Sequence, residues 1–431
     1  MHFGGIAVGK YIVQGGKRIE GVFSVRGSKN ACLPILAACV LAEDEVVLEN
    51  IPLISDVLHT LDILEEIGCR VKREGRTAVI DSCCLQKTEI GNDAVCRMRS
   101  SILFLGALLG REKQAELACP GGCAIGRRPI DLHLSAFEKM GVEIREADCR
   151  LHCRAKTVAG SDIFLPFPSV GATENILLLA ARAEGVTTIH NAAREPEVIA
   201  LVRFLRACGA QIYGEGTNSI LIEGTEPLHG SVYTIPGDRI EGGTFLCAAA
   251  MTGGNLCLRG LERSDIGAVL ETLRMTGCSF WWEDSDFLWM KPPKKLRSDF
   301  SLVTGPFPAF PTDMQPLLMS LLTLANGSCM ISETVFEARF SQCAELCQMG
   351  ADISVFGRQA CVRGVEKLHG AEVSAHDLRC GAALLCAALA AEGESIVHGS
   401  SYVERGYERL EDAFSFLGGD IRLQEERNPY V

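Results

Sequence analysis

The chain has 431 residues, a formal net charge of −12 and a sequence pI near 5.4. General nucleic-acid binders and proteins of anionic membranes carry basic surfaces, so this balance argues against both partners. Hydrophobic residues make up 47% and charged residues 22%, which excludes a disordered chain. The length predicts two or three domains.

The 20 cysteines point to a reduced compartment. A disulfide scaffold is typical of small secreted proteins, whereas this chain is large and begins with neither a basic nor a long apolar signal segment. We therefore expect a cytoplasmic protein whose thiols are mostly buried. The longest apolar stretches, such as residues 380–391, are shorter than the roughly 20 residues of a membrane span. We assign no function to residues 1–9.

In chain order, the first unit sets the pattern for the rest. Residues 31–42 are apolar nearly all round and predict a helix buried on every side. Residues 45–50 predict a strand, and residues 55–67 an amphipathic helix with Val57, Leu61 and Leu64 on one face. Gly68 predicts the end of that helix.

This unit recurs with a period of about seventy residues. The stop glycines are Gly68, Gly141, Gly209, Gly277, Gly350 and Gly418, with successive differences of 73, 68, 68, 73 and 68. Buried helices are predicted again at 101–110, 172–183, 243–253, 314–325 and 379–391, and strands at 115–120, 186–191, 255–260, 328–333 and 395–400. Each unit reads helix, strand, loop, helix, strand.

We therefore predict an α/β fold of two domains, an inside-out α/β barrel of six units, three per domain, with buried helices and outer sheets. Residues 29–236 form the first domain, and residues 1–28 plus 237–431 the second. The first strands, near residues 11–28, are expected to pair with the C-terminal half. The active site is expected in the cleft between the domains.

Polar residues stand just before each buried helix. They are Lys29 and Asn30, Arg99 and Ser100, Ser169 to Gly171, Asp238 to Glu241, Asp313, and Asp377 to Arg379. Helix N-termini bind anions through free N–H groups and the helix dipole, so their recurrence predicts an anionic substrate. For each residue taken singly, the alternative is a helix cap or a solvated side chain.

The second unit contains PGGCAIGRRPIDLH, residues 120–133. Gly121 and Gly122 loosen the backbone before Cys123, and Arg127 and Arg128 favour its thiolate. This combination suits a closing lid that carries a reactive thiol. The alternative is a glycine-rich turn with a buried structural cysteine.

Nine strings occur in the order found in one enzyme family: GSKNACLPILAA, MRSS, PGGCAIGRRPIDLH, SVGATEN, NAAREPE, PAFPTDMQ, ETVFEARF, HDLRCGAAL and ERGYERLED. The strings lie between residues 27 and 412, and the chain thereby resembles the UDP-N-acetylglucosamine enolpyruvyl transferases over about residues 11–421. The resemblance implies transfer of the enolpyruvyl group of phosphoenolpyruvate to the sugar 3-hydroxyl, the first committed step of peptidoglycan precursor synthesis. It also implies a role in cell-wall biogenesis, cell shape and division, and sensitivity to fosfomycin.

The resemblance implies four catalytic residues, Lys29, Cys123, Asp313 and Arg405. Lys29, Arg379 and Arg405 are then expected around phosphoenolpyruvate, with Arg99 as a further cleft arginine. Arg128 is expected near the lid cysteine and in the uridine and diphosphate site. Asp313 is expected beside the sugar hydroxyl as a general base or acceptor, unless it is only a helix cap. The remaining implied substrate contacts are Asn30, Pro129, Ile130, Asp131, Leu132, Ser169, Val170, Gly171, Val335, Arg339 and Asp377.

Some relatives carry a lysine where this chain has Phe167, so one diphosphate contact is expected from elsewhere, such as Arg127. Glu195 and Glu197 match acids of the family and are ranked as structural. The scheme needs no metal and no cofactor. Cys149, His152 and Cys153 suggest a metal site only weakly, because no second ligand pair accompanies them.

Two rival functions remain open at this stage. One is the sister enzyme that acts on shikimate 3-phosphate, which lacks the cysteine lid. The other is a catalytically silent paralogue that serves as a binding protein. In either case we expect a monomer or weak homo-oligomer.

Overall fold

The computed structural model describes residues 9–91, 95, 98–118, 125–126, 129–225 and 227–425. They form two compact units, each with its own hydrophobic core. Unit 1 comprises the described residues within Met1–Arg26, Cys123–Arg127 and Gly237–Val431, and unit 2 those within Gly27–Gly122 and Arg128–Pro236. In this part of the chain no helix is long and apolar enough to cross a membrane.

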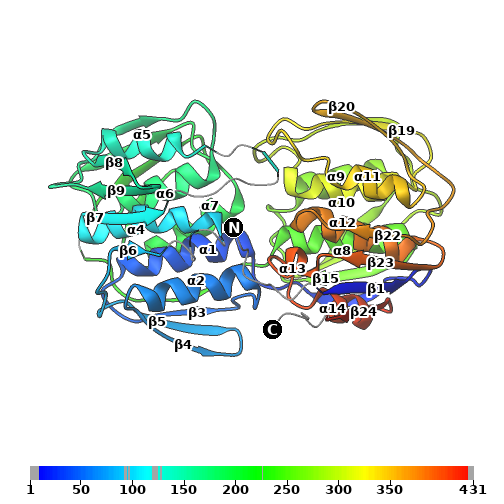
Figure 1. Cartoon of the computed structure of the whole chain (residues 1–431), viewed down its shortest axis with the longest axis horizontal. Coiled ribbons are helices and arrows are strands. Elements are labelled where there is room, and N and C mark those ends of the chain that lie inside the picture. The colour runs from blue at the N-terminus through cyan, green and yellow to red at the C-terminus, as the bar shows by residue number, and fades with distance from the viewer. Residues whose placement is uncertain are drawn as a thin grey trace. The chain divides into compact units, whose positions relative to one another are not determined.

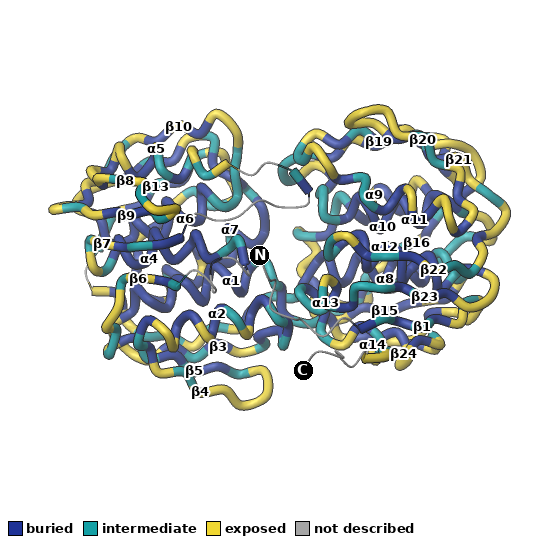
Figure 2. The backbone as a smooth tube through the Cα atoms, in the orientation of Figure 1, coloured by how far each residue is buried: buried dark blue, intermediate teal, exposed yellow. Residues whose placement is uncertain are grey.

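In unit 2, buried helices lie inside and strands outside (Figures 1 and 2). The buried helices are α1 (Lys29–Ala38), α4 (Leu103–Glu112) and α6 (Val170–Ala180). The amphipathic helices are α2 (Ser55–Glu66), α5 (Asp131–Lys139) and α7 (Pro196–Ala207), and the 3₁₀ turns are η1 (Cys39–Leu41) and η2 (Arg99–Ile102). The strands are β3 (Val46–Glu49), β4 (Arg70–Glu74), β5 (Thr77–Asp81), β6 (Glu89–Ile90), β7 (Gln114–Ala118), β8 (Glu143–Ala147), β9 (Arg150–Arg154), β10 (Asp162–Phe164), β11 (Val186–His190), β12 (Gln211–Tyr213), β13 (Ser219–Glu223) and β14 (Val232–Thr234).

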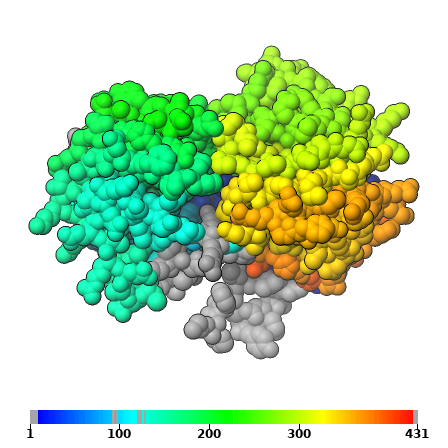
Figure 3. Space-filling view, turned by 90° about the horizontal axis from the view of Figure 1, so that it is seen from above, coloured from blue at the N-terminus to red at the C-terminus, as the bar shows by residue number. Residues whose placement is uncertain are grey.

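Unit 1 repeats this arrangement. Its buried helices are α8 (Arg239–Thr252), α10 (Gln315–Leu322) and α12 (Leu378–Ala390). The other helices are α9 (Gly267–Met275), α11 (Gln342–Gln348), α13 (Ser400–Val403) and α14 (Leu410–Phe416), with the 3₁₀ turn η3 (Thr312–Met314). The strands are β1 (Lys10–Gln14), β2 (Gly21–Ser24), β15 (Leu256–Arg259), β16 (Ser279–Glu283), β17 (Phe287–Lys291), β18 (Phe300–Val303), β19 (Ser328–Ser332), β20 (Asp352–Phe356), β21 (Gln359–Arg363), β22 (Glu372–Ser374), β23 (Glu394–His398) and β24 (Asp420–Gln424). In the space-filling view, the light-green, yellow and orange parts of the chain together cover one face of this unit (Figure 3).

The described strands form four-stranded sheets that share one topology. An edge strand runs parallel to the strand after the buried helix, and two antiparallel strands complete the sheet, as in β10, β11, β13 and β12. The other orders are β14-β3-β5-β4, β6-β7-β9-β8, β2-β15-β17-β16, β18-β19-β21-β20 and β22-β23-β1-β24. The α/β class with buried helices and outer sheets is thereby confirmed.

The N-terminal strands pair with the C-terminal half, as expected. β1 lies between β23 and β24, where Tyr11 is opposite both Val397 and Leu423. β2 pairs in parallel with β15. The chain passes into unit 2 after Arg26 and belongs to unit 1 again from Gly237 onward. Between these points, of the described residues, only 125 and 126 belong to unit 1.

The predicted helix stops are confirmed. All six glycines have positive φ, between 90° and 105°. In the first of the six sequence repeats, Gly68 N–H donates to Glu65 O at 3.0 Å and Cys69 N–H to Leu64 O at 2.9 Å. These hydrogen bonds close the end of the helix. A side chain at such a φ costs roughly 1–2 kcal/mol, which is why glycine recurs there.

Two glycines allow the buried helices of unit 2 to pack very closely. A Cβ on Gly106 of α4 would lie 2.3 Å from Asn175 Oδ1 of α6, and one on Gly110 would lie 3.1 Å from Leu178 O. Because the contact partners advance in the same direction along both helices, α4 and α6 run parallel. Their N-termini therefore lie at the same end of unit 2.

Candidate active site

Asp313 forms an ion-pair cluster with two buried arginines in unit 1. Arg339 Nη2 donates to Asp313 Oδ1 at 2.7 Å, and Arg379 Nη2 and Nε donate to Oδ2 at 2.9 and 3.2 Å. Each arginine is 3% exposed, whereas 26% of the Asp313 side chain is accessible. Two guanidinium groups share one carboxylate, and guanidinium groups suit the paired oxygens of an anionic ligand.

Arg379 is held from both ends. Its backbone N–H donates to Asp377 Oδ1 at 2.9 Å, which caps α12. Its Nη1 donates to the Tyr407 hydroxyl at 3.2 Å, and that hydroxyl lies 2.7 Å from Thr244 Oγ1 of α8. The site thus joins residues of η3, α8, α12 and the segment after α13.

The charges in this cluster shift the pKa values of its members. Burial, the largest single influence, lowers the pKa of Arg379, but the charges of Asp313 and Asp238 and the Tyr407 phenol together outweigh it and raise that pKa, so the guanidinium stays charged. Burial raises the pKa of the Tyr407 phenol to about 12, against the opposing effect of the Arg379 charge. Tyr407 is therefore a neutral phenol at physiological pH.

The segment before Arg339 is fixed by one carboxylate. Glu333 Oε1 accepts hydrogen bonds from Val335 N–H at 2.8 Å and Phe336 N–H at 3.1 Å. Its Oε2 accepts one from the Thr312 hydroxyl at 2.9 Å, which ties η3 to this segment. The Arg339 guanidinium carbon lies 5.6 Å from the centre of the Phe336 ring. Val335 and Arg339, both predicted substrate residues, are thereby positioned beside Asp313.

In unit 2, Lys29 pairs with a residue that sequence reasoning did not select. Its Nζ lies 2.8 Å from Asp56 Oδ2, and the two side chains are 11% and 4% exposed. Lys29 and Asn30 open α1, whose N-cap Ser28 accepts a hydrogen bond from Ala31 N–H. The sequence signal that could have identified Asp56 is its place in the first turn of the next amphipathic helix, α2. Asp56 is the counter-ion of Lys29, the lysine predicted to contact phosphoenolpyruvate.

The Ser169–Gly171 segment begins α6. Ser169 Oγ accepts from Ala172 N–H at 3.4 Å, so it caps the helix, and all three residues are partly exposed. A Cβ on Gly171 would lie 3.3 Å from His133 Cε1, and His133 Nδ1 is 3.0 Å from Asn175 Nδ2. This segment therefore lies beside the first turn of α5, where Asp131 and Leu132 are found.

The remaining predicted residues are placed as follows. Arg99 is the first residue of η2, Pro129 is exposed, Ile130 is the N-cap of α5, and Arg405 is partly buried two residues before Tyr407. Ile130 also packs against the core of unit 2. Cys123, Arg127 and Arg128 lie outside the described residues, as do Gly121 and Gly122. Close by in sequence, Ile125 O accepts a hydrogen bond from Ala338 N–H at 3.1 Å.

One alternative for an individual residue can be decided. The cap interpretation of Asp313 is wrong, because Asp313 lies inside η3, whose N-cap is Pro311, and the N-cap of α10 is Met314. His152 and Cys153 alternate along β9, so Cys153 is buried while His152 contacts Glu116. No metal-binding group of three His, Cys, Asp or Glu side chains occurs among the residues that the structure describes.

Sequence reasoning also missed Tyr407 and Thr244. Tyr407 stands in the same ERGYE string as Arg405, but a phenol carries no charge that would single it out. Thr244 lies in the apolar run of α8, where a hydroxyl is usually bonded to its own helix. Only the fold brings them to Arg379.

Comparison with known proteins places these residues in one family. A sequence model described as EPSP synthase (3-phosphoshikimate 1-carboxyvinyltransferase) matches residues 13–414. UDP-N-acetylglucosamine 1-carboxyvinyltransferase 2 of Caldanaerobacter subterraneus subsp. tengcongensis is 47% identical over 96% of this chain and 99% of its own length. UDP-N-acetylglucosamine 1-carboxyvinyltransferase of Nitratidesulfovibrio vulgaris (strain Hildenborough) is 46% identical over 97% of this chain and its whole length.

Solved structures agree with this placement. The enolpyruvyl transferase NikO from Streptomyces tendae has a TM-score of 0.89 and 27% identity, covering 98% of this chain and all of its own. An EPSP synthase from Acinetobacter baumannii, with a TM-score of 0.75, 20% identity and coverage of 97% and 100%, shares the fold. The chain therefore belongs to the EPSP synthase family of enzymes and, within it, to the UDP-N-acetylglucosamine 1-carboxyvinyltransferases.

Proposed function

We propose that this enzyme transfers the enolpyruvyl group of phosphoenolpyruvate to the 3-hydroxyl of UDP-N-acetylglucosamine and releases phosphate. The observation that carries the proposal is the Asp313 cluster, which puts a carboxylate and two buried cations in one place. The named relatives, at 46–47% identity over nearly the whole chain, support the same reaction. Lys29 belongs to unit 2 and Asp313 to unit 1, and the proposal assigns both residues a part in the reaction.

In this proposal the cations bind the donor. Phosphoenolpyruvate carries a phosphate and a carboxylate, and each offers the paired oxygens that a guanidinium fork recognises. Arg379, Arg405 and Arg128 supply the forks, and Lys29 supplies a compact charge for the phosphate. Arg379 is buried, and an electrostatic contact is stronger away from bulk water. It therefore stabilises charge that develops on the departing phosphate.

Asp313 acts on the acceptor. Its carboxylate takes the proton of the sugar 3-hydroxyl, or accepts a hydrogen bond from it, as the hydroxyl oxygen adds to the donor carbon. Arg339 and Arg379 fix both of its oxygens, which holds the carboxylate in one orientation. Protonation of the donor methylene carbon accompanies the addition, and loss of a proton from the resulting methyl group then restores the double bond as phosphate leaves the tetrahedral intermediate.

Cys123 delivers or receives a proton at the donor from the lid, with Arg127 and Arg128 favouring its thiolate. Asn30, Ser169, Val170, Gly171 and the Pro129–Leu132 segment hold the UDP-sugar. Fosfomycin, an epoxide, alkylates this thiol in our proposal. The enzyme acts in the cytoplasm, where its step of peptidoglycan precursor synthesis supports cell shape and division.

Phosphate release from phosphoenolpyruvate tests the proposal directly. We expect turnover with UDP-N-acetylglucosamine and none with shikimate 3-phosphate or without an acceptor. Equal or greater turnover with shikimate 3-phosphate would assign the activity of the sister enzyme instead. No turnover with either acceptor would indicate a silent paralogue.

A further inference from the structure

We propose that Tyr407 is a positioning residue for the reaction, which fixes the buried guanidinium of Arg379 through a directed hydrogen-bond chain from Thr244. The inference rests on the proposed function, because Arg379 matters for turnover only if it serves the substrates. It extends that function to two residues that contribute no charge.

The direction of the chain follows from its donors and acceptors. The Thr244 hydroxyl has one proton, and it donates this proton to Ile240 O at 2.8 Å within α8. In the 2.7 Å contact with Tyr407, Thr244 Oγ1 must then be the acceptor, so the phenol proton points at Thr244. The phenol oxygen is left to accept from Arg379 Nη1 at 3.2 Å.

Three of the five N–H donors of the Arg379 guanidinium thereby bond to Asp313 and Tyr407. Nε and Nη2 hold Asp313 Oδ2, while Nη1 is held by Tyr407. The Tyr407 ring also lies against the guanidinium, with 5.6 Å between the ring centre and the Arg379 Cζ atom. Tyr407 and Thr244 are 2% and 0% exposed, so bulk water does not reach the hydrogen-bond chain at these two residues.

This arrangement keeps one orientation of the Asp313–Arg379 pair. Without the phenol oxygen, Nη1 would be a buried donor without its acceptor, and the guanidinium would turn to find another. Such a turn would move the two nitrogen atoms that hold Asp313. Tyr407 therefore acts through Arg379 and not on the substrates.

The test is the kinetics of Tyr407→Phe in the full chain, which removes one oxygen atom. A hydrogen bond to a charged group is commonly worth about 1.5 kcal/mol or more, equivalent to about tenfold. We expect kcat/KM for phosphoenolpyruvate to fall about tenfold, with KM for UDP-N-acetylglucosamine changed less than about twofold. The matched control is Tyr11→Phe in β1. The Tyr11 phenol is 1% exposed and takes no part in the hydrogen-bond chain, so this variant should keep kcat/KM for phosphoenolpyruvate and KM for UDP-N-acetylglucosamine unchanged.

Thr244 supplies a second, independent arm. Thr244→Val removes the acceptor of the phenol proton, so it should lower kcat/KM for phosphoenolpyruvate in the same direction, whereas Thr244→Ser should restore it. In the Tyr407→Phe background, Thr244→Val should have little further effect on kcat/KM, because the hydrogen-bond chain is already interrupted at Tyr407. If Tyr407→Phe fails to fold, the Thr244 variants decide the question.

The outcomes separate the two proposals. If Tyr407→Phe matches Tyr11→Phe in every kinetic constant, even at a lower melting temperature, Tyr407 is only a core residue and the inference is overturned. Additive effects of Tyr407→Phe and Thr244→Val would overturn the directed chain. No phosphate release by the unsubstituted chain with UDP-N-acetylglucosamine would overturn the proposed function, and the inference with it.

Discussion

Asp313→Asn is the most specific perturbation of the site, because it replaces one carboxylate oxygen by an NH₂ group and removes one negative charge. The amide oxygen can still accept from one arginine, but the NH₂ group then faces the donors of the other. Arg339 and Arg379 would lose the carboxylate that neutralises one of their two charges. The variant therefore tests the cluster as a stabilising feature, apart from any role in turnover.

The size of the effect follows from the burial of the partners. Removing one partner of a buried ion pair typically costs about 3–5 kcal/mol, because the remaining charge is left uncompensated. Both arginines are 3% exposed, but 26% of the Asp313 side chain is accessible, so water relieves part of the loss. We expect the low end, about 3 kcal/mol. For a unit of this size that is a fall of about 6–12 °C in the melting temperature of unit 1.

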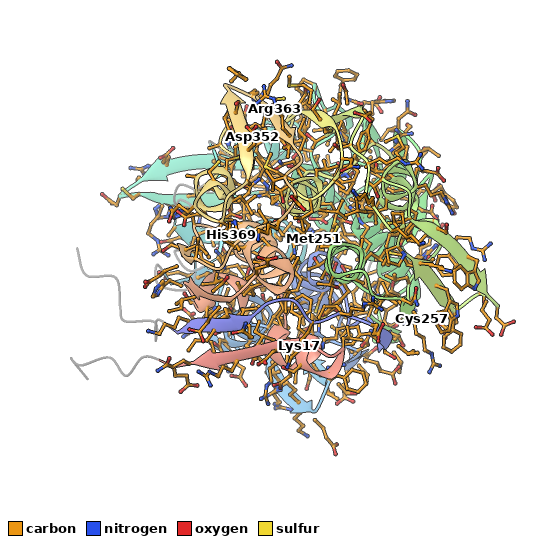
Figure 4. The ribbon with its side chains drawn as sticks, turned by 90° about the vertical axis from the view of Figure 1, so that its right-hand side faces the viewer. Lys17, Met251, Cys257, Asp352, Arg363 and His369 are labelled. Atoms are coloured by element: carbon orange, nitrogen blue, oxygen red, sulfur yellow. The ribbon has the colours of Figure 1, made fainter. Side chains whose placement is uncertain are left out.

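Differential scanning calorimetry measures this fall, and Asp352→Asn is the control. Asp352 pairs with Arg363 at 3.3 Å on the surface of the same unit, where both side chains are more than half exposed (Figure 4). An exposed pair contributes roughly 0–1 kcal/mol, so this variant should melt nearly as the unsubstituted chain does. If Asp313→Asn melts no lower than Asp352→Asn, the cluster does not stabilise unit 1 and the reasoning is refuted. With UDP-N-acetylglucosamine, Asp313→Asn should also lower kcat at least about a hundredfold.

Four further results are expected. Burial, with added repulsion from Glu197 and Glu195, raises the pKa of Glu174 well above its ordinary 4.5 in the folded chain. Above pH 4.5 the unfolded chain therefore binds fewer protons than the folded chain, and the stability of the folded state declines as pH rises. Glu174→Gln should therefore stabilise unit 2 more at pH 8 than at pH 5 in thermal unfolding. Asp56→Asn should lower the stability of unit 2 by about 3 kcal/mol because it removes the carboxylate 2.8 Å from the mostly buried Lys29 ammonium, and unchanged melting would argue against that pair. Fosfomycin should modify Cys123 before other thiols, which peptide mass mapping decides, and Cys123→Asp should resist it while keeping some turnover. Small-angle scattering should show a smaller radius of gyration with UDP-N-acetylglucosamine, and an unchanged value would favour a preformed site.

Much of the fold could be predicted because its signals are local. A helix that is apolar all round must be buried, and in α6 every residue from Ala172 to Ala180 is. The stop glycines mark a backbone conformation that other residues adopt only with strain. The second strand of each hairpin was missed, although β5, with the sequence TAVID, carries three apolar residues in five and alternates buried with partly buried positions. The two-residue strand β6 has no sequence signal at all.

The site was harder to predict, because its contacts join residues far apart in the sequence. Asp313 is 26 residues from Arg339 and 66 from Arg379. No periodicity connects such positions, and resemblance alone brought them together in the analysis of the sequence. The partners Asp56 and Tyr407 lack even that support, since their roles depend on side-chain packing.

The structure also explains why polar residues at equivalent places in the repeat have different roles. Ser28, Ser169, Asp238 and Asp377 are N-caps whose side chains accept hydrogen bonds from the first turns of α1, α6, α8 and α12. Helices α4 and α10 have no such side-chain cap, and each is preceded by a 3₁₀ turn that contains Arg99 or Asp313. A 3₁₀ turn satisfies backbone groups by itself, so the charged side chain in it is not needed for capping. At Asp313 that side chain is used instead to gather two arginines from distant segments, which is how one position of a repeated unit becomes part of a site.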